Sequence, residues 1–204
     1  FRKQLSPIIF KSHIMKNIAI FASGTGTNAE NIIKYFSTRN SAKVVLVLSN
    51  RREAGVLKRA EALGVNTYFF DRNDFYVSGS VLKHLLQSRI DFIVLAGFLW
   101  LVPDNIIKCF EGRLINIHPA LLPAYGGKGM YGDRVHRAVI ENKDRESGIT
   151  IHYVNNNYDE GDIVFQAKCK VGQSDTPESL ASRIHALEYK YFPEIIEKLI
   201  LEME

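Results

Sequence analysis

Short apolar runs recur along the first part of the chain, and each is separated from the next by a segment with helical spacing. β-Branched and aromatic residues are frequent in these runs, which is typical of buried strands. Alternation of this kind predicts βαβ units on a parallel sheet. The expected strands are residues 17–22, 43–49, 65–70, 91–96 and 114–118, and the expected helices are residues 28–36, 54–63, 75–88 and 103–110.

The pattern changes after Pro119. Residues 120–132 are rich in glycine and are expected to form a loop, followed by a helix at 134–141. Residues 148–154 and 162–171 alternate apolar and polar positions, which predicts a hairpin-like pair at a sheet edge. A long helix is expected at 176–203, broken or kinked at Pro193.

These elements together predict an α/β fold. We expect a Rossmann-like, mostly parallel sheet flanked by helices, with an antiparallel edge near the C-terminus. Ligands on such sheets bind at the carboxyl ends of the strands. The strand at 114–118 has one of these ends at His118.

The composition is that of a soluble globular protein, with 46% hydrophobic and 24% charged residues among 204. A net charge of +4 is too small to indicate nucleic-acid binding, and no apolar run has the length of a membrane span. The two cysteines and six histidines show no metal-binding spacing, so no metal is expected.

Residues 1–14 contain basic residues, no acidic residue and no long apolar core. We expect this segment to be an N-terminal extension, natural or artificial, rather than an organellar transit peptide. Residues 15–204 are expected to form a single domain, because their number suits one hydrophobic core.

Two polar side chains interrupt the apolar strand at 114–118. Asn116 and His118 point to the same face, because side chains alternate along a strand. An amide can donate a hydrogen bond to a developing oxyanion, and an imidazole can donate or move a proton. The pair therefore suits chemistry on a carbonyl carbon, although many such polar groups are merely satisfied by neighbouring backbone.

A glycine-rich turn at residues 23–28 (SGTGTN) lies between the first strand and the first helix. Glycines allow close approach of the backbone to an anion, and the helix N-terminus presents free N–H groups to it. The residue pattern therefore predicts a phosphate site, with a plain turn as the alternative.

Gly24, Gly26 and Ala29 also fit the loose G-x-G-x-x-G/A pattern of dinucleotide-binding proteins. The acidic residue expected after the second strand is absent, although Arg51 or Arg52 could hold the phosphate of NADP. No P-loop lysine is present, which argues against an NTPase.

Asp159 lies in a polar segment between the last two expected strands. The segment has the composition of an ordinary turn. A carboxylate that reaches His118 would raise the pKa of the imidazole and orient it, but the sequence spacing leaves open whether the two meet.

The chain resembles the phosphoribosylglycinamide formyltransferase family, the folate-dependent transformylases of purine synthesis. The matching segments occur in the family's order and extend from residue 17 to the C-terminus. They are residues 22–28 (ASGTGTN), 94–98 (VLAGF), 112–123 (GRLINIHPALLP), 135–138 (VHRA), 148–154 (GITIHYV) and 159–161 (DEG).

The resemblance implies a role for each matching position. The catalytic residues would be Asn116, His118 and Asp159, and Glu188 would bind the substrate ribose rather than lie on a solvated helix face. The substrate phosphate would bind to Gly24, Thr25, Gly26, Thr27 and Asn28. The folate would contact Phe98, Leu99, Trp100, Leu101, Val102, Asn156 and Tyr158.

The resemblance also implies the ligands and partners. The substrates would be glycinamide ribonucleotide and 10-formyltetrahydrofolate as cosubstrate, with no metal, nucleic acid or membrane involved. A cytoplasmic monomer or homodimer is expected. Methionyl-tRNA formyltransferase and formyltetrahydrofolate deformylase are related alternatives, but each normally carries a further domain for which we expect no room. A non-catalytic nucleotide-binding module is the alternative from a different class.

Three positions depart from the family pattern. Trp100 stands where many members have an arginine near the folate pterin. The glycine-rich stretch at 126–132 is longer than the loop of many members and could cover the site. Near Ser78 and Gly79 there is no counterpart of the family's phosphate-contacting arginine, so a lysine or arginine elsewhere would have to compensate.

Overall fold

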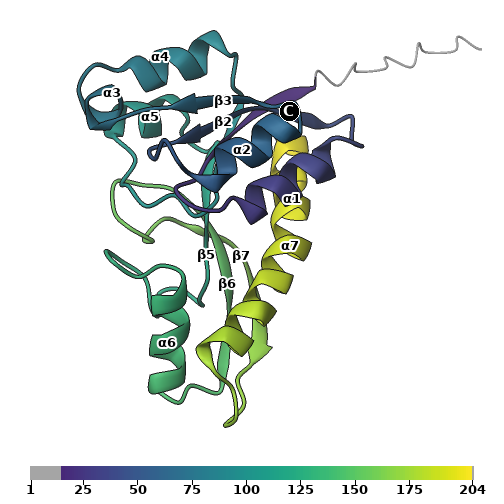
Figure 1. Ribbon diagram of the computed structural model, residues 1–204, viewed down its shortest axis with the longest axis vertical. Coiled ribbons are helices and arrows are strands. Elements are labelled where there is room, and N and C mark those ends of the chain that lie inside the picture. The colour runs from purple at the N-terminus through teal and green to yellow at the C-terminus, as the bar shows by residue number, and fades with distance from the viewer. Residues whose placement is uncertain (1–14, 204) are drawn as a thin grey trace, which may run out of the picture.

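A computed structural model describes residues 15–203 (Figure 1), so the predicted N-terminal extension lies outside the described residues. The centre is a seven-stranded sheet with strand order β3-β2-β1-β4-β5-β6-β7. The strands from β3 to β5 are parallel, and β6 and β7 add an antiparallel edge. The strands are β1 (Lys16–Phe21), β2 (Ala42–Ser49), β3 (Asn66–Phe69), β4 (Phe92–Leu95), β5 (Leu114–His118), β6 (Glu146–Tyr153) and β7 (Ile163–Lys170).

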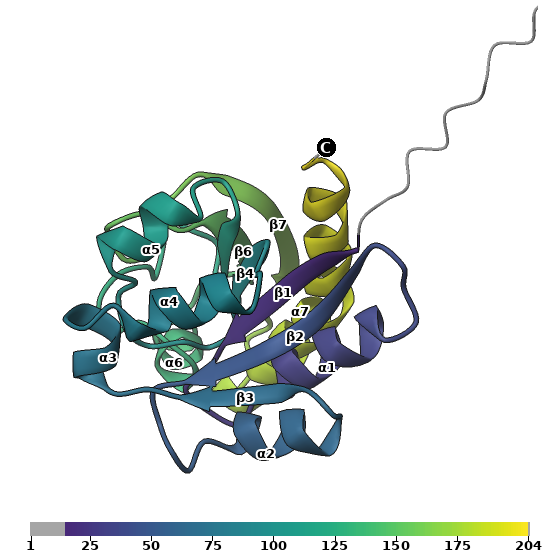
Figure 2. The same cartoon turned by 90° about the horizontal axis from the view of Figure 1, so that it is seen from above.

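Helices cover both faces of this sheet (Figure 2). Buried residues of α1, α2 and α7 pack on one face, and those of α3, α4 and α5 pack on the other. No helix in residues 15–203 is long and apolar enough to cross a membrane. The helices are α1 (Thr27–Phe36), α2 (Gly55–Ala62), α3 (Arg72–Tyr76), α4 (Ser80–Gln87), α5 (Asp104–Cys109), α6 (Asp133–Glu141) and α7 (Pro177–Leu201).

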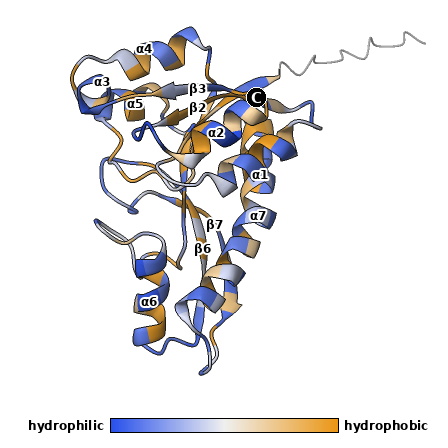
Figure 3. Cartoon of the chain, in the orientation of Figure 1, coloured by the Kyte–Doolittle hydropathy of each residue, from blue (hydrophilic) through white to orange (hydrophobic). Residues whose placement is uncertain are grey.

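The alternation of side chains along β1 explains the two layers of core. Ile18 and Ile20 belong to the cluster under α1 and α7, whereas Ala19 and Phe21 belong to the cluster under α4 and α5. A central parallel strand is buried on both faces, so its sequence is a continuous apolar run. On the covering helices, Figure 3 shows hydrophobic and hydrophilic stretches alternating along α4 and α6. The predicted α/β fold with an antiparallel C-terminal edge is confirmed.

The single helix predicted at residues 75–88 is wrong, because this region contains two helices. Asp71 begins α3 with a capping box, in which its side chain accepts from Asp74 N–H at 2.9 Å. Gly79 then takes a left-handed conformation (φ 69°) immediately before α4. Glycine adopts positive φ without the steric cost that other residues carry, so it allows the chain to turn between the two helices.

The helix α7 continues through Pro193, so of the predicted break or kink the break is wrong. Proline has no N–H, which leaves the carbonyl of Tyr189 without its usual partner one turn earlier. The side-chain amide of Asn31 in α1 donates to that carbonyl at 2.9 Å. A neighbouring helix therefore satisfies the group that Pro193 leaves free.

Candidate active site

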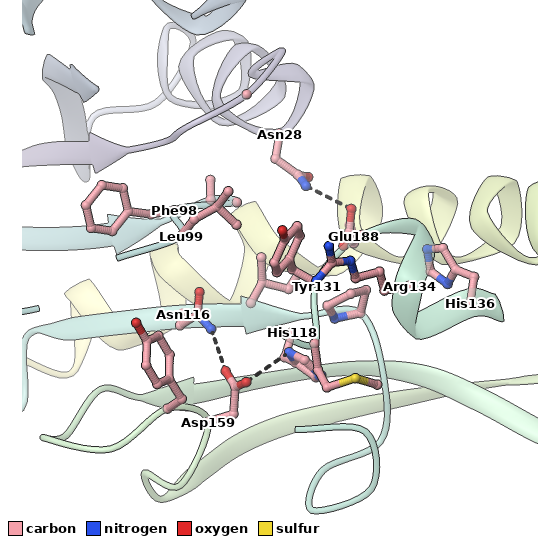
Figure 4. A pocket seen from close by; sticks show the side chains of 18 of the residues that line it. Asn28, Phe98, Leu99, Asn116, His118, Tyr131, Arg134, His136, Asp159 and Glu188 are labelled. Atoms are coloured by element: carbon pink, nitrogen blue, oxygen red, sulfur yellow. Dashed lines mark hydrogen bonds and ion pairs between the residues drawn. The ribbon is translucent and has the colours of Figure 1, made fainter. Parts of the chain in front are cut away.

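A cavity of about 540 Å³ opens where β1, β4 and β5 end. Its walls come from the turn before α1, the end of β5, the glycine-rich segment 126–132 and one face of α7 (Figure 4). Ligand sites in open α/β sheets occur at this end of the strands. The polar and charged side chains that line it are those of Thr25, Thr27, Asn28, Asn116, His118, Lys128, Tyr131, Arg134, His136, Tyr158, Asp159, His185 and Glu188.

Strand β5 places Asn116 and His118 in this cavity. The strand is fixed on both sides, by β4 in parallel and by β6 in antiparallel register. The two side chains share a face, as their spacing predicts, while Ile115 and Ile117 point into the core. His118 is 3% exposed, and Asn116 is half-buried.

Asp159 reaches both of these side chains from the loop between β6 and β7 (Figure 4). Its Oδ2 lies 3.5 Å from His118 Nδ1, and Asn116 Nδ2 donates to its Oδ1 at 3.4 Å. The backbone N–H of Gly127 also donates to Oδ2, at 3.0 Å. Asp159 has φ 58°, a left-handed conformation in which aspartate is enriched. The two segments that the sequence left unconnected therefore meet.

The second ring nitrogen of His118 is held by the backbone. Its Nε2 lies 2.7 Å from the carbonyl oxygen of Tyr125, and a carbonyl can only accept, so Nε2 carries a hydrogen. Burial lowers the pKa of His118, while the negative charge of Asp159 and the Tyr125 carbonyl act in the opposite direction. Nδ1 is the ring atom that faces the carboxylate.

His152 belongs to the same cluster, although the sequence did not identify it. It lies opposite Asn116 in the β5–β6 register, and its Nε2 is 3.1 Å from Asn116 Nδ2 and 3.6 Å from Asp159 Oδ1. Burial acts to raise the pKa of Asp159, but contact with His152 and the charge of His118 hold that pKa below its usual value. The alternation in residues 148–154 predicted a strand, and only its register could have revealed His152.

The glycine-rich turn lies across the cavity from β5, with Gly24 to Asn28 in the lining. Ser23 anchors it by donating to Asn50 Oδ1 at 2.7 Å and accepting from Leu99 N–H at 3.1 Å. Gly26 has φ 82° and is tightly packed, since a Cβ there would lie 2.5 Å from Val56. The free N–H groups at the start of α1 favour an anion at this position.

Glu188 of α7 faces the same turn. It is 6% exposed and accepts from Asn28 Nδ2 at 2.8 Å. Burial raises the pKa of Glu188, while the Asn28 hydrogen bond acts in the opposite direction. Asn28 Oδ1 is buried and has no hydrogen-bond partner among the described residues. The carboxylate and this oxygen can both accept hydrogen bonds from hydroxyl groups.

A second, smaller cavity of about 50 Å³ adjoins the first, and both are lined by Asn116 and Asp159. Leu99 lines only the larger cavity, and Asn156 lines neither. The side-chain amide of Asn156 donates to Asp104 at 3.3 Å. The predicted folate residues that do line the smaller cavity are Phe98, Trp100, Leu101, Val102 and Tyr158.

Trp100 is part of an aromatic cluster at this cavity. Its ring stacks on Tyr76 with the ring centroids 6.0 Å apart, and the guanidinium of Arg72 lies 4.8 Å from its centroid.

Residues 15–203 contain no group of three or more acidic, histidine or cysteine side chains with the geometry of a metal site.

Arg51 and Arg52, the candidate NADP-phosphate residues, are absent from the lining of both cavities. The guanidinium of Arg52 instead stacks 4.3 Å from the centroid of Phe69.

Comparison with known proteins agrees with the fold. The sequence model of the formyl transferase family matches residues 16–196, so the chain belongs to the formyl transferase family. Phosphoribosylglycinamide formyltransferase of Bacillus subtilis (strain 168) is 34% identical over 191 residues, covering 91% of this chain and 95% of that protein. The chloroplastic enzyme of that name from Arabidopsis thaliana is 39% identical over 187 residues, covering 89% of this chain.

This chain spans 64% of the length of the Arabidopsis protein.

Two solved structures show the same architecture. Phosphoribosylglycinamide formyltransferase from Bacillus halodurans superposes with a TM-score of 0.82 at 34% identity, covering 93% of this chain and 97% of that one. Glycinamide ribonucleotide transformylase 1 from Symbiobacterium toebii has a TM-score of 0.84 at 32% identity, covering 97% and 92%.

Proposed function

We propose that this chain transfers the formyl group of 10-formyltetrahydrofolate to the amine of glycinamide ribonucleotide, a step of de novo purine biosynthesis. The observation that carries the proposal is the position of Asn116 and Asp159, which line both cavities and contact one another. The ribonucleotide occupies the larger cavity and the pterin part of the folate occupies the smaller one. The amine and the formyl carbon then meet beside His118.

The ribonucleotide is held at its two polar parts. Its phosphate binds the backbone N–H groups of residues 24–28, where the start of α1 favours negative charge. Its ribose hydroxyls donate to Glu188, which faces the same turn. Both contacts lie away from the reacting atoms, so they orient the amine without taking part in the chemistry.

The reaction proceeds through a tetrahedral intermediate. The substrate amine attacks the formyl carbon, a carbon–nitrogen bond forms, and negative charge develops on the formyl oxygen. Asn116 Nδ2 and the Nδ1–H of protonated His118 donate to that oxygen, and Asp159 stabilises the imidazolium. The bond to N10 of the folate then breaks. The proton lost by the amine passes to N10, and tetrahydrofolate leaves.

A direct assay tests the proposal. The purified chain is mixed with glycinamide ribonucleotide and 10-formyltetrahydrofolate, and release of tetrahydrofolate and formation of the formylated ribonucleotide are followed. We expect both products in equal amounts. Folate release that does not depend on the ribonucleotide would instead identify a deformylase. Calorimetric binding of the nucleotide with no binding of the formyl-folate would identify a non-catalytic module.

The remaining expectations on partners follow from the same proposal. The chain acts on small molecules, without a metal, nucleic acid or membrane, in the cytoplasm and as a monomer or homodimer. Two of the relatives are named as chloroplastic, so location differs among the proteins that this chain resembles. Light scattering of the purified chain at several concentrations would measure the oligomeric state.

A further inference from the structure

The larger cavity contains few permanent positive charges. Among its lining residues only Lys128 and Arg134 are lysine or arginine, and both lie at the glycine-rich segment 126–132 or just after it. Residues 24–28 contain no cation, and Asp159 and Glu188 add carboxyl groups. A phosphate monoester carries about −1.5 to −2 charges at neutral pH. The backbone of the turn therefore offers partial charges where the proposed substrate needs full ones.

Arg134 is free to supply one of these charges. Its guanidinium lies 5.0 Å from the ring centroid of Tyr131 and makes only a long contact, 3.5 Å, with the carbonyl of Gly129. Within the described part of the chain, no carboxylate lies within 4.0 Å of Arg134 or Lys128. Both side chains are exposed to solvent.

A third cation, Arg59, contacts the turn but not the cavity. Arg59 of α2 donates to the carbonyl of Thr25 at 3.0 Å and pairs with Glu30 of α1. Arg59 is absent from the cavity lining, so it stabilises the turn from the side that faces away from the cavity. In Figure 4, Arg134 and Tyr131 lie between Asn28 and His118 in the view.

We infer that Lys128 and Arg134, which line the same cavity as residues 24–28, together bind the substrate phosphate. They supply the positive charge that residues 24–28 lack. A guanidinium can donate two parallel hydrogen bonds to phosphate oxygens, and a lysine adds a point charge. This inference rests on the proposed function, because it takes glycinamide ribonucleotide as the substrate.

The test removes the two cations and the phosphate separately. The double variant Lys128→Gln, Arg134→Gln is compared with the unchanged chain on glycinamide ribonucleotide and on its phosphate-free riboside. Charge-assisted hydrogen bonds of this kind correspond to about tenfold to a hundredfold in affinity. We expect kcat/KM for the ribonucleotide to fall by this factor, mostly through KM, and kcat/KM for the riboside to stay unchanged.

Arg137→Gln is the matched control. Arg137 lies on α6 like Arg134 and is exposed, but it is absent from the cavity lining. We expect this variant to keep its kcat/KM on the ribonucleotide, which separates a local contact from a general change in charge. Inhibition by ribose 5-phosphate gives a second readout, and its inhibition constant should rise in the double variant by the same factor.

Two results would overturn the inference. One is an unchanged KM for the ribonucleotide in the double variant. The other is an equal loss of kcat/KM on the ribonucleotide and on the riboside. This would mean that the two side chains affect the conformation of segment 126–132 and do not bind the phosphate. Failure of the proposed function looks different, because the unchanged chain would then release no tetrahydrofolate in response to the ribonucleotide.

Discussion

His118 is held between a backbone carbonyl on Nε2 and a carboxylate facing Nδ1, so its ring cannot turn without losing both contacts. Asn116, two positions earlier, points at the same carboxylate. In the proposed reaction each side chain donates one hydrogen bond to the oxyanion.

Asn116→Ala and His118→Ala should each lower kcat by about a hundredfold, since the loss of one oxyanion donor typically costs about 3 kcal/mol. A steady-state assay with both substrates measures the kcat of each variant. The thermal melt of each variant serves as the control for folding. Near-normal turnover by either variant would remove that residue from the catalytic assignment.

Asp159→Asn should lower the pKa of His118 further below its ordinary value of 6.5. Burial already lowers this pKa, and the carboxylate of Asp159 is the main group acting against burial. The amide keeps the size of the side chain but removes its charge. Titration of the His118 ring signal by NMR measures the shift. An unchanged titration midpoint would show that the carboxylate and the imidazole are not coupled.

At the scale of elements, Gly26 shows how packing fixes the turn before α1. The left-handed backbone and the close approach of Val56 both exclude a side chain there. Gly26→Ala should lower the free energy of unfolding by about 2 kcal/mol, the usual cost of such backbone strain. Urea denaturation measures it.

Gly24→Ala is the control for that variant, because a Cβ on Gly24 meets no atom within 4 Å and its φ is not positive. We expect it to leave the free energy of unfolding nearly unchanged. Equal losses in the two variants would mean that the close contact at Gly26 is not what limits the turn.

The contact between α1 and α7 compensates for the N–H that Pro193 lacks. Asn31→Ala should lower the free energy of unfolding by about 1 kcal/mol, because the carbonyl of Tyr189 loses the donor that replaces the missing N–H of Pro193. In a Pro193→Ala background the helix can supply its own N–H to that carbonyl. The cost of removing Asn31 should then shrink, and a double-mutant cycle by urea denaturation measures the coupling. A cost that is the same in both backgrounds would contradict this account of Pro193.

For the whole molecule, buried histidines make stability depend on pH. His136 is 2% exposed, and burial, followed by the nearby His185, lowers its pKa below 6.5. The unfolded chain therefore binds a proton more readily than the folded chain, so stability falls as the pH drops below 6.5. His118 acts in the same direction.

His136→Gln should reduce this dependence. Urea denaturation from about pH 7.5 to about pH 5.5 should show a smaller loss of stability in the variant than in the unchanged chain. The comparison cancels the contribution of Glu188, whose raised pKa acts with the opposite sign. Equal slopes would show that His136 is not a source of the acid sensitivity.

The sequence by itself determined the strands, the antiparallel edge and the shared face of Asn116 and His118. These follow from local periodicity, because the alternation of side chains is a property of the strand itself. The turn at residues 23–28 was also recognisable from the sequence. Glycines just before a helix allow a tight turn and the close approach of an anion, and this depends only on neighbouring residues. The division of residues 75–88 into two helices was missed, because apolar spacing continues across Gly79.

Only the tertiary structure decided which distant groups meet. Asp159 reaches His118 through a loop with a left-handed residue, and His152 joins them through strand register. Glu188 and Asn28 are 160 positions apart and become neighbours because α7 packs on α1. Such contacts depend on the packing of whole elements and on loop conformation, which local sequence patterns do not encode.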